Sequence, residues 1–497
     1  MPKFFRRLDL TCEIRTNIGL DAINAKGQYG AIIDLARKNN ISRETVYKFK
    51  NSLLDVFSLE KKESETSDKD NYNLMLKKSI LGLRFCCKSS ITGISEYLRC
   101  LGNGSNTSIG HISKFLNEIS INAVDDLPIR TEKIDILADE IFISGQPILV
   151  IMDATDHYIL AIELAKDRTG ETWESCYQGL IDKGYNVNII AKDLGSGLQK
   201  GVDLINENND INFISRPDLF HLLCRFNPPL AFFSRKAYGA IELEESSINC
   251  LENRKSDEAK LKWTEKAVEI IDDCEVKIFE YDAYFELYYA LHDAFNPFSK
   301  DGILRNEKTI MNDIDSILNL FEWFFPSYNK IQDAVSFLRK HISGYFSYIN
   351  DIEYIINKYN KILPFYQINL VCKTYQTNLK SIAVKDYQHS KKLKNEADDA
   401  WKLASIISQM NESEAIDNLL KELNKTVRSS SALEAKNSVL RKFFNTSSNQ
   451  ITQENLNLIV FYMNHKTSIR GKYKGKSPFE RFTGIIEDES FIEKLLA

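Results

Sequence analysis

The segment from Lys133 to Leu223 alternates apolar, β-branched runs of strand length with short groups of turn residues. This pattern is typical of a sheet, and one amphipathic run from about Trp173 to Lys183 interrupts it as a helix. The predicted strands cover residues 135–143, 147–152, 158–164, 187–190 and 212–215. The first three form a meander, whereas a strand reached through a helix should lie parallel to one already in the sheet. We therefore predict an α/β core over residues 130–226, with a mixed five-stranded sheet and flanking helices.

Residues 28–57 show a different pattern, in which apolar positions recur at helical spacing on both sides of a short polar turn. Ser42 is a suitable N-cap for the second helix. The inner side of that helix is predicted to carry Val46, Tyr47, Leu53 and Leu54. Its outer side is mostly basic and includes Arg43, Lys48 and Lys50. Residues 1–60 therefore contain either a DNA-binding helix-turn-helix, whose second helix enters the major groove, or a plain helical hairpin.

A polar, charged stretch follows over residues 60–72, and we interpret it as a linker. Helices are then predicted over residues 73–87, 90–101 and 107–123, as a second helix-turn-helix-like module that spans 73–125. Two such modules in tandem favour a DNA-binding N-terminal region over accidental helices.

From residue 227 to residue 422 the apolar pattern is helical almost throughout, with prolines between the helices. This block is too long to be a crossover within one sheet, so we predict an inserted all-α domain. Residues 423–497 then return to the core and contain a basic tail. Residues 421–482 carry twelve Lys or Arg and four Glu, a local net charge of +8 in a chain of net charge -5. Such a basic face can bind phosphates even when the whole chain is acidic.

Two acidic residues stand out in the predicted sheet, because Asp139 lies within the first strand and Asp193 lies just after the fourth. Neighbouring parallel strands would bring both carboxylates to one edge, where they suit hard divalent cations such as Mg²⁺ or Mn²⁺. Two such ions can clamp the attacking and the leaving oxygen of a phosphodiester. Asp153 is an alternative to Asp139, but it lies at a strand end beside a turn. Acids at strand ends are often solvated turn residues, so a purely structural role stays open.

Asp218 and His221 stand three residues apart at the start of a predicted helix, so they can share one face. Cys224 could add a sulfur ligand, but three residues without a fourth partner make a weak zinc motif. We treat Asp218 and His221 as accessory residues of the site, and a structural hydrogen bond explains His221 equally well.

A helix of the returning segment carries a further acid, which the resemblance described below makes the third acid of the site. Glu434, Asn437 and Arg441 fall at positions i, i+3 and i+7 on one face of a helix that residues 429–431 can cap. Three other glutamates lack Asn and Arg at these spacings and are weaker alternatives: Glu412, Glu414 and Glu422. A flexible basic loop follows, which suits phosphate contact or forms a solvated tail. Its lysines are Lys472, Lys474 and Lys476.

The sequence offers no sign of export or membrane insertion. No apolar run reaches the roughly 18 residues of a transmembrane helix, and residues 1–7 lack a following apolar signal region. The nine cysteines are scattered without a CxxC pair, which suits reduced thiols. We expect a cytoplasmic protein without a membrane partner.

Four segments together resemble bacterial insertion-sequence transposases of the DDE type, which belong to the RNase H-like, retroviral-integrase superfamily. ILADEIFISG, with Asp139, resembles their first catalytic strand, and IIAKDLGSGLQKG, with Asp193, resembles their second motif. ISRPDLFHLL resembles their Asp-x-Phe-His step. SSSALEAKNSVLRKFF, with Glu434, and NHKTSIRGKYKGKSPFERFTG resemble their Glu-x-x-Asn-x-x-x-Arg helix and Lys-Ser-Pro tail. Two features depart from the pattern: the pI of about 6.0 is low, and 241 residues separate Glu434 from Asp193.

The resemblance implies an RNase H-like catalytic core in which Asp139, Asp193 and Glu434 hold two Mg²⁺ (or Mn²⁺) ions and catalyse DNA cleavage and strand transfer. His221 and Arg441 would orient phosphate, and Asn437 would contact the DNA beside Arg441. The implied partners are double-stranded DNA, as transposon ends and target, and at least one further copy of the chain, because two ends must be joined. In a bacterium the protein would be nucleoid-associated. The alternatives are an inactive or domesticated DNA-binding derivative, another RNase H-like nuclease and a helical scaffold.

Overall fold

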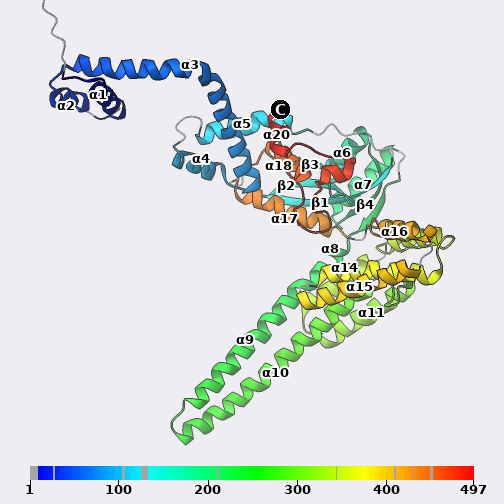
Figure 1. Cartoon of the computed structure of the whole chain (residues 1–497). Helices are drawn as coiled ribbons and strands as arrows, with labels where there is room; N and C mark the ends of the chain where they lie inside the picture. Colours follow the sequence, from blue (N-terminus) through cyan, green and yellow to red (C-terminus); the bar gives the residue numbers. More distant parts are fainter. Residues whose placement is uncertain are drawn as a thin grey trace, which may run out of the picture. The chain divides into compact units, whose positions relative to one another are not determined.

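The structure is a computed structural model, and it describes most of the chain. The described residues are 9–25, 28, 30–102, 107–124, 132–209, 212–342, 344–384, 386–407, 410–427, 429–447 and 451–497. They belong to two compact units, residues 1–104 and residues 105–497. Most elements are helices, and the second unit contains a five-stranded mixed sheet (Figure 1). An α/β core accompanied by all-helical regions is therefore present.

The five strands have the spatial order β3-β2-β1-β4-β5. Their bounds are β1 Lys133–Ile143, β2 Gln146–Asp153, β3 Ile159–Leu164, β4 Asn186–Lys192 and β5 Ile214–Pro217. Strands β1, β2 and β3 form an antiparallel meander, while β4 runs parallel to β1 and β5 runs parallel to β4. The predicted strands and the parallel direction of the fourth strand are confirmed, because β-branched runs and the helical crossover leave few other arrangements.

The two faces of the sheet are covered by different helices. Helices α6 (Gly170–Asp182) and α7 (Ser196–Asn209) build the core on one face. The side chains that β1 contributes to this core are Ile134, Ile136 and Ala138. Because side chains alternate along a strand, Asp139 points to the opposite face. There α17 (Ser431–Asn445) packs against β1.

The first unit has a small core of its own, in which α1 (Cys12–Asn24) and α2 (Ala31–Lys38) pack against the start of α3 (Arg43–Leu81). As predicted, the hydroxyl of Ser42 caps α3 by accepting a hydrogen bond from the Thr45 amide at 3.1 Å. The helix, turn, helix arrangement predicted for residues 28–57 is therefore present in the described part of this segment.

The inner face of α3 differs from the prediction. Tyr47 and Leu54 are 49% and 42% exposed rather than buried. The reason is α1, a helix that the sequence pattern did not reveal. Its packing makes Val46 and Phe49 the core positions, which turns Tyr47 toward solvent.

The predicted linker over residues 60–72 is also wrong, because α3 continues through it to Leu81 without a break. The stretch contains no Gly or Pro, and its Lys and Glu residues are good helix formers. Polarity alone therefore does not end a helix here. The π-helical turn η1 (Gly82–Cys86) and α4 (Ile91–Cys100) complete the first unit. Helix α5 (Ile109–Ile119), predicted as part of the same module, belongs to the second unit and contacts α18.

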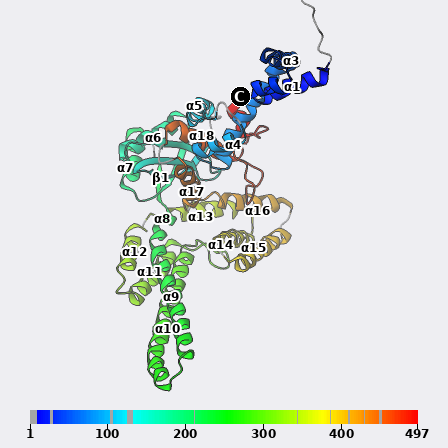
Figure 2. The same cartoon turned by 90° about the vertical axis from the view of Figure 1, so that its left-hand side faces the viewer.

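A large helical region lies between β5 and α17. Its elements are α8 (Leu219–Leu223), η3 (Cys224–Phe226), α9 (Asn227–Glu252), α10 (Asp257–Ala294), α11 (Glu307–Phe324), α12 (Asn329–His341), α13 (Ser347–Tyr359), α14 (Phe365–Ala383), α15 (Tyr387–Ile407) and α16 (Met410–Leu423). They share one extensive apolar core. Helices α9 and α10 form a long antiparallel hairpin (Figures 1 and 2).

The chain leaves the sheet for these helices and returns beside its point of exit. Arg216, buried at the end of β5, donates hydrogen bonds to the carbonyl of Val427 at 2.9 Å and to Asp351 of α13 at 2.7 Å. The returning segment is thus fastened to the strand from which the helical region departs. This contact brings α17 back to the sheet.

The last helices are α18 (Gln453–His465), α19 (Pro478–Thr483) and α20 (Phe491–Leu496). Two side chains of α18 pair with the free edge of β3. Asn464 accepts the Ile159 amide hydrogen at 2.9 Å and donates to the Ile159 carbonyl at 3.0 Å, and Gln453 bonds the Leu164 amide at 2.8 Å. These bonds satisfy backbone groups that an edge strand would otherwise leave unpaired. None of the helices in the described part of the chain is both long and apolar enough to cross a membrane.

Candidate metal centre

Strand register places two carboxylates side by side. Ala138 of β1 pairs with Lys192 of β4, so Asp139 and Asp193 are the next residues on two parallel neighbours. Asp193 begins the turn into α7, and its Oδ1 accepts the Gly195 amide hydrogen at 2.7 Å. A side chain at position 195 would place its Cβ 2.8 Å from that same oxygen, so glycine is needed for the approach.

Asp139 is only 4% exposed and is held by two hydrogen bonds. Its Oδ1 accepts the Glu140 amide hydrogen at 2.8 Å, and its Oδ2 accepts a hydrogen from Nδ2 of Asn437 at 2.7 Å. Asn437 is fully buried on α17, and its Oδ1 has no hydrogen-bond partner among the described residues. The prediction that Asn437 contacts DNA is therefore wrong for this structure, because its side chain is fully buried against Asp139, although Glu434 and Arg441 on the same helix face reach solvent.

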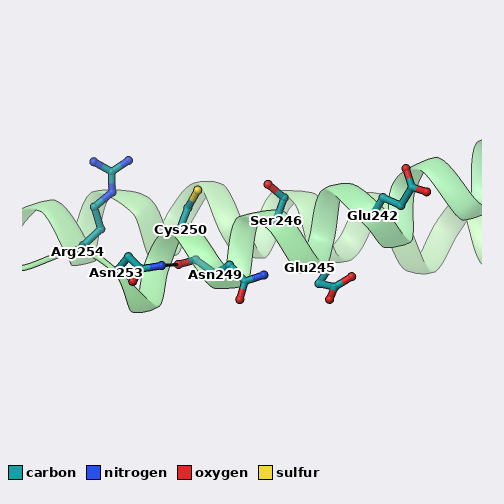
Figure 3. A pocket seen from close by; sticks show the side chains of 7 residues that line it. All are labelled: Glu242, Glu245, Ser246, Asn249, Cys250, Asn253 and Arg254. Carbon is teal, nitrogen blue, oxygen red and sulfur yellow. Dashed lines mark hydrogen bonds between the residues drawn. The ribbon is translucent and has the colours of Figure 1, made fainter.

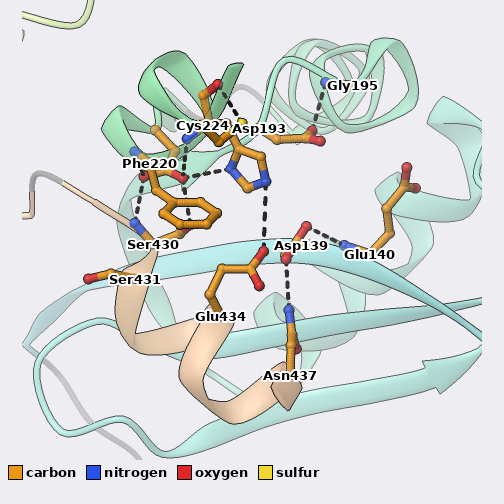
Figure 4. A network of polar contacts seen from close by, with 12 residues as sticks. Asp139, Glu140, Asp193, Gly195, Phe220, Cys224, Ser430, Ser431, Glu434 and Asn437 are labelled. Atoms are coloured by element: carbon orange, nitrogen blue, oxygen red, sulfur yellow. Dashed lines mark hydrogen bonds and ion pairs between the residues drawn. The ribbon is translucent and has the colours of Figure 1, made fainter. Parts of the chain in front are cut away.

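Glu434 of α17 reaches the same place, as the sequence predicted, although 241 residues separate it from Asp193. Its carboxyl is close enough to Asp139 for its negative charge to raise the pKa of Asp139. Its Oε1 lies 3.8 Å from Nε2 of His221, and its Oε2 lies 3.8 Å from Nη1 of Arg441. Figure 4 shows Glu434 on α17 with its carboxyl directed toward the Asp139 side chain on β1.

A second set of hydrogen bonds positions His221. Its Nδ1 lies 2.6 Å from Oδ2 of the buried Asp218. Asp218 also accepts the Ser430 amide hydrogen and the Ser430 hydroxyl hydrogen, each at 2.6 Å. Residues 429–431 were predicted to cap the helix of Glu434; Ser430 stands at the N-cap, but its hydroxyl makes no cap hydrogen bond and donates to Asp218 instead. The start of α17 is thereby fixed to the N-terminus of α8, the short helix that carries His221.

The proximity of these groups changes their proton affinities. Burial and the negative charge of Glu434 raise the pKa of Asp139 to about 7. Burial acts to lower the pKa of His221, but the hydrogen bond to Asp218 and three nearby carboxylates outweigh it and raise that pKa to about 9. Burial opposes ionisation of Asp218, whereas its hydrogen bonds from His221 and Ser430 favour it and leave its pKa lowered. The carboxylates near Asp139 and His221 therefore favour the binding of protons or cations at this point.

We call Asp139, Asp193, His221 and Glu434 the acidic cluster. Within the described residues, Asp139, Asp193 and His221 each offer one ligand atom, and these atoms all lie within 4.8 Å of one another. The expected convergence of Asp139 and Asp193 is confirmed, and their spacing could hold a metal ion. Cys224 does not join them, because its thiol donates to the His221 carbonyl at 3.2 Å.

The alternatives to these acids have other roles. The Asp153 carboxylate accepts the amide hydrogens of Thr155 at 3.0 Å and Asp156 at 2.5 Å, so it closes the β2–β3 turn. Glu412 accepts a hydrogen bond from Gln367, Glu414 is exposed on α16, and Glu422 pairs with Lys358. Glu412, Glu414 and Glu422 all lie on α16, among the helices after β5, and the hydrogen bonds described for the acidic cluster do not involve them.

The residues predicted to contact DNA are mostly accessible. Arg43 and Lys48 are exposed on α3 of the first unit, and Lys50 is half-buried there. In the second unit Arg441, Lys472, Lys474 and Lys476 are exposed. A separate pocket lies along the C-terminal part of α9. It is lined by Glu242, Glu245, Ser246, Asn249, Cys250, Asn253 and Arg254 (Figure 3). It shares no residue with the acidic cluster.

Sequence reasoning missed the role of Ser430 and the direction of Asn437, because helix spacing gives the shared face of residues but not what that face meets. Comparisons with known proteins add no relative: no family model, curated protein or solved structure matches this chain.

Proposed function

We propose that this protein is a DDE-type transposase, a metal-dependent enzyme that cleaves DNA and transfers the cut strand. The observation that carries the proposal is the meeting of Asp139, Asp193 and His221, whose ligand atoms all lie within 4.8 Å of one another, with Glu434 of α17 3.8 Å from His221 and near enough to raise the pKa of Asp139. A structural role would not require three carboxylates to be brought together against their mutual repulsion.

The strand order supports an RNase H-like core for this enzyme. A three-strand meander followed by two parallel strands places an acid on the first strand and another after the fourth. The helix that carries the third acid covers the face to which Asp139 points. The helical region is then an insertion between the second and third acids.

The donor set fits Mg²⁺ or Mn²⁺, since carboxylate oxygens are the ligands that hard cations prefer. Asp139, Asp193 and Glu434 would hold two such ions, which supply an activated water or 3′-hydroxyl and a counter-charge for the leaving oxygen. The chain itself fixes the carboxylates. Asn437 orients Asp139, and the Gly195 amide orients Asp193.

His221 and Arg441 flank the third acid and suit a phosphate. Each lies 3.8 Å from one oxygen of Glu434, on opposite sides of its carboxyl group. A guanidinium donates two hydrogen bonds to a phosphate in a fixed geometry, so Arg441 can orient the DNA backbone beside the acids. Asp218 holds the His221 ring in place from the other side.

The first unit supplies sequence recognition in this proposal. Arg43 and Lys48 are exposed on the early turns of α3, the second helix of the helix-turn-helix. Such a helix can enter the major groove and place these side chains on base edges or phosphates. Because two transposon ends must be joined, the active assembly contains at least two copies of the chain.

The test is cleavage of the DNA that flanks the coding sequence. Purified full-length protein is incubated with a supercoiled plasmid carrying both flanks, with Mg²⁺ or with EDTA. We expect cuts at the flank boundaries, leaving 3′-hydroxyl ends, only in Mg²⁺. An Asp193→Asn variant should bind the plasmid and not cut it. Metal-independent cleavage, or a variant as active as the wild type, would exclude the proposed enzyme.

A further inference from the structure

A group of positive side chains gathers on the other side of α17. Lys436 lies two residues after Glu434, so a rotation of about 200° along the helix separates the two side chains. Lys466, Lys472 and Arg481 come from the segment after α18. The charges of Arg481 and Lys466 both act on Lys436. We call Lys436, Lys466, Lys472 and Arg481 the cation cluster.

Tyr473 is the centre of this arrangement. The Arg481 guanidinium carbon lies 3.6 Å from the centroid of its ring, and the Lys472 ammonium lies 5.3 Å from it. The Tyr473 hydroxyl donates to the Thr155 carbonyl at 3.3 Å, which ties the loop to the β2–β3 turn. His157 of that turn meets the ring edge-on, with centroids 5.5 Å apart. Contact with the Tyr473 ring therefore positions Arg481 and Lys472, although the Lys472 side chain stays exposed to solvent.

The cluster lacks paired carboxylates. Within the part of the chain that the structure describes, none of its four cations forms an ion pair. Nη1 of Arg481 is buried without a hydrogen-bond partner among those residues. Asp153 and Asp156 lie near Arg481, but the turn amides already use Asp153. Four cations face two carboxylates, which leaves an excess of positive charge.

His157 lies beside the same positive charges. Its backbone is held at a φ of 59°, an uncommon conformation for a residue other than glycine. Burial, followed by the positive charges of Arg481, Lys436 and Lys472, lowers its pKa to about 4. The imidazole is therefore neutral at pH 7 and adds no cation. A group beside it that carries negative charge would relieve the repulsion.

We propose that the cation cluster is a second phosphate-binding site, which holds a backbone phosphate of the same DNA whose scissile phosphate lies at the acidic cluster. This inference rests on the proposed function. Guanidinium and ammonium groups around an aromatic ring match a phosphodiester, whose oxygens accept several charge-assisted hydrogen bonds. A strand of DNA is favoured over a free phosphate because α17 carries both Glu434 and Lys436, and the opposite sides of one helix are only about 10–12 Å apart, a distance that a few nucleotides of one backbone span.

The test compares DNA binding by full-length variants in the absence of divalent metal. The changes are Lys436→Gln and Lys466→Gln, with Lys183→Gln, an exposed lysine at the end of α6, as the matched control. Affinity for a flanking duplex and for an unrelated duplex is measured at several salt concentrations. Each cluster variant should bind both duplexes about tenfold more weakly. For each cluster variant, the slope of log affinity against log salt concentration should become less negative by about 1, which corresponds to the loss of one phosphate contact.

Several outcomes separate the possibilities. Cluster variants with wild-type affinity and salt dependence would overturn the site, as would a loss confined to the flanking duplex. Inorganic phosphate that raises the melting temperature of the wild type without being displaced by DNA would assign the site to free phosphate and overturn the DNA assignment. Arg481→Gln is compared with Arg481→Lys, and both are checked by thermal melting. If the wild type cleaves flanking DNA but the cluster variants bind DNA as tightly as the wild type, the phosphate-site proposal fails and the proposed function stands. If the wild type neither binds nor cleaves flanking DNA, both proposals fail.

Discussion

Asn437 offers a sharp test of how the acidic cluster is held, and the change is Asn437→Leu. The side chain is fully buried, and its amide donates to Asp139 at 2.7 Å while its own oxygen has no partner among the described residues. Leucine has a similar size and is a good helix former, so α17 should persist. What is lost is the hydrogen bond that orients the Asp139 carboxylate.

The expected effect on stability is small because two terms oppose each other. A hydrogen bond to a charged group contributes about 1.5–3 kcal/mol, and a buried acceptor without a partner costs about 1–3 kcal/mol. Leucine removes both, so the free energy of unfolding should change by no more than about 1 kcal/mol. Function should change much more, because loss of a residue that orients a metal ligand typically costs 10- to 100-fold in metal affinity or activity.

The assay combines urea unfolding with Mg²⁺ titration of plasmid cleavage. Asn464→Leu is the matched control, since Asn464 is equally buried but bonds both backbone groups of Ile159. Its loss leaves two buried backbone groups unpaired and should cost roughly 2–6 kcal/mol, with an unchanged Mg²⁺ requirement in the folded protein. Asn437→Leu that unfolds like Asn464→Leu, or that keeps wild-type Mg²⁺ dependence, would refute the orienting role.

Three further predictions concern other parts of the chain. Hydrogen bonds, the first from His465, lower the pKa of the Glu487 carboxyl despite its burial, so Glu487→Gln should lose about 2 kcal/mol of stability at pH 7. Because this pKa is lower in the folded protein, the ionised Glu487 stabilises the fold above the unfolded pKa of 4.5, and this stabilisation is lost as the pH falls through the folded pKa. Urea unfolding curves of the wild type and Glu487→Gln should therefore converge below pH 4.5, and a difference in stability that does not change with pH would contradict this. Gly195→Ala should displace the Asp193 carboxylate and reduce cleavage about tenfold or more while thermal melting stays cooperative, and full activity would refute the close approach. Arg43→Glu should weaken binding of flanking DNA about tenfold with cleavage chemistry intact in saturating protein, and unchanged binding would remove α3 from recognition.

The sheet was predictable because its signal is local and repetitive. Apolar runs of strand length, turn residues between them and one helical crossover fix both the strands and the parallel direction of β4. That direction then brings Asp139 and Asp193 together. The preference for Asp139 over Asp153 also follows from local pattern, since Asp153 begins a turn and bonds its amides.

Other features could not be obtained in this way, because they depend on what a residue meets across the fold. The spacing of Glu434 and Asn437 gave one helix face, but only packing shows that this face meets Asp139. The cation cluster joins Lys436 to Arg481 through a loop whose path the sequence does not fix. The continuation of α3 through residues 60–72 shows the converse error, in which a polar stretch is mistaken for a linker although it contains no Gly or Pro to break the helix.

The central claim is that Glu434 acts with Asp139 and Asp193 in metal-dependent DNA cleavage, and Glu434→Gln tests it most directly. Glutamine keeps the size and helix propensity and removes the charge that a cation needs. Cleavage of flanking DNA in Mg²⁺ and equilibrium binding to the same DNA are measured on one preparation, with the exposed Glu454→Gln of α18 as control. The account predicts that Glu434→Gln abolishes cleavage while binding stays within about twofold of wild type, and that the control changes neither. Cleavage by Glu434→Gln at the wild-type rate would show that the acidic cluster is not the catalytic site.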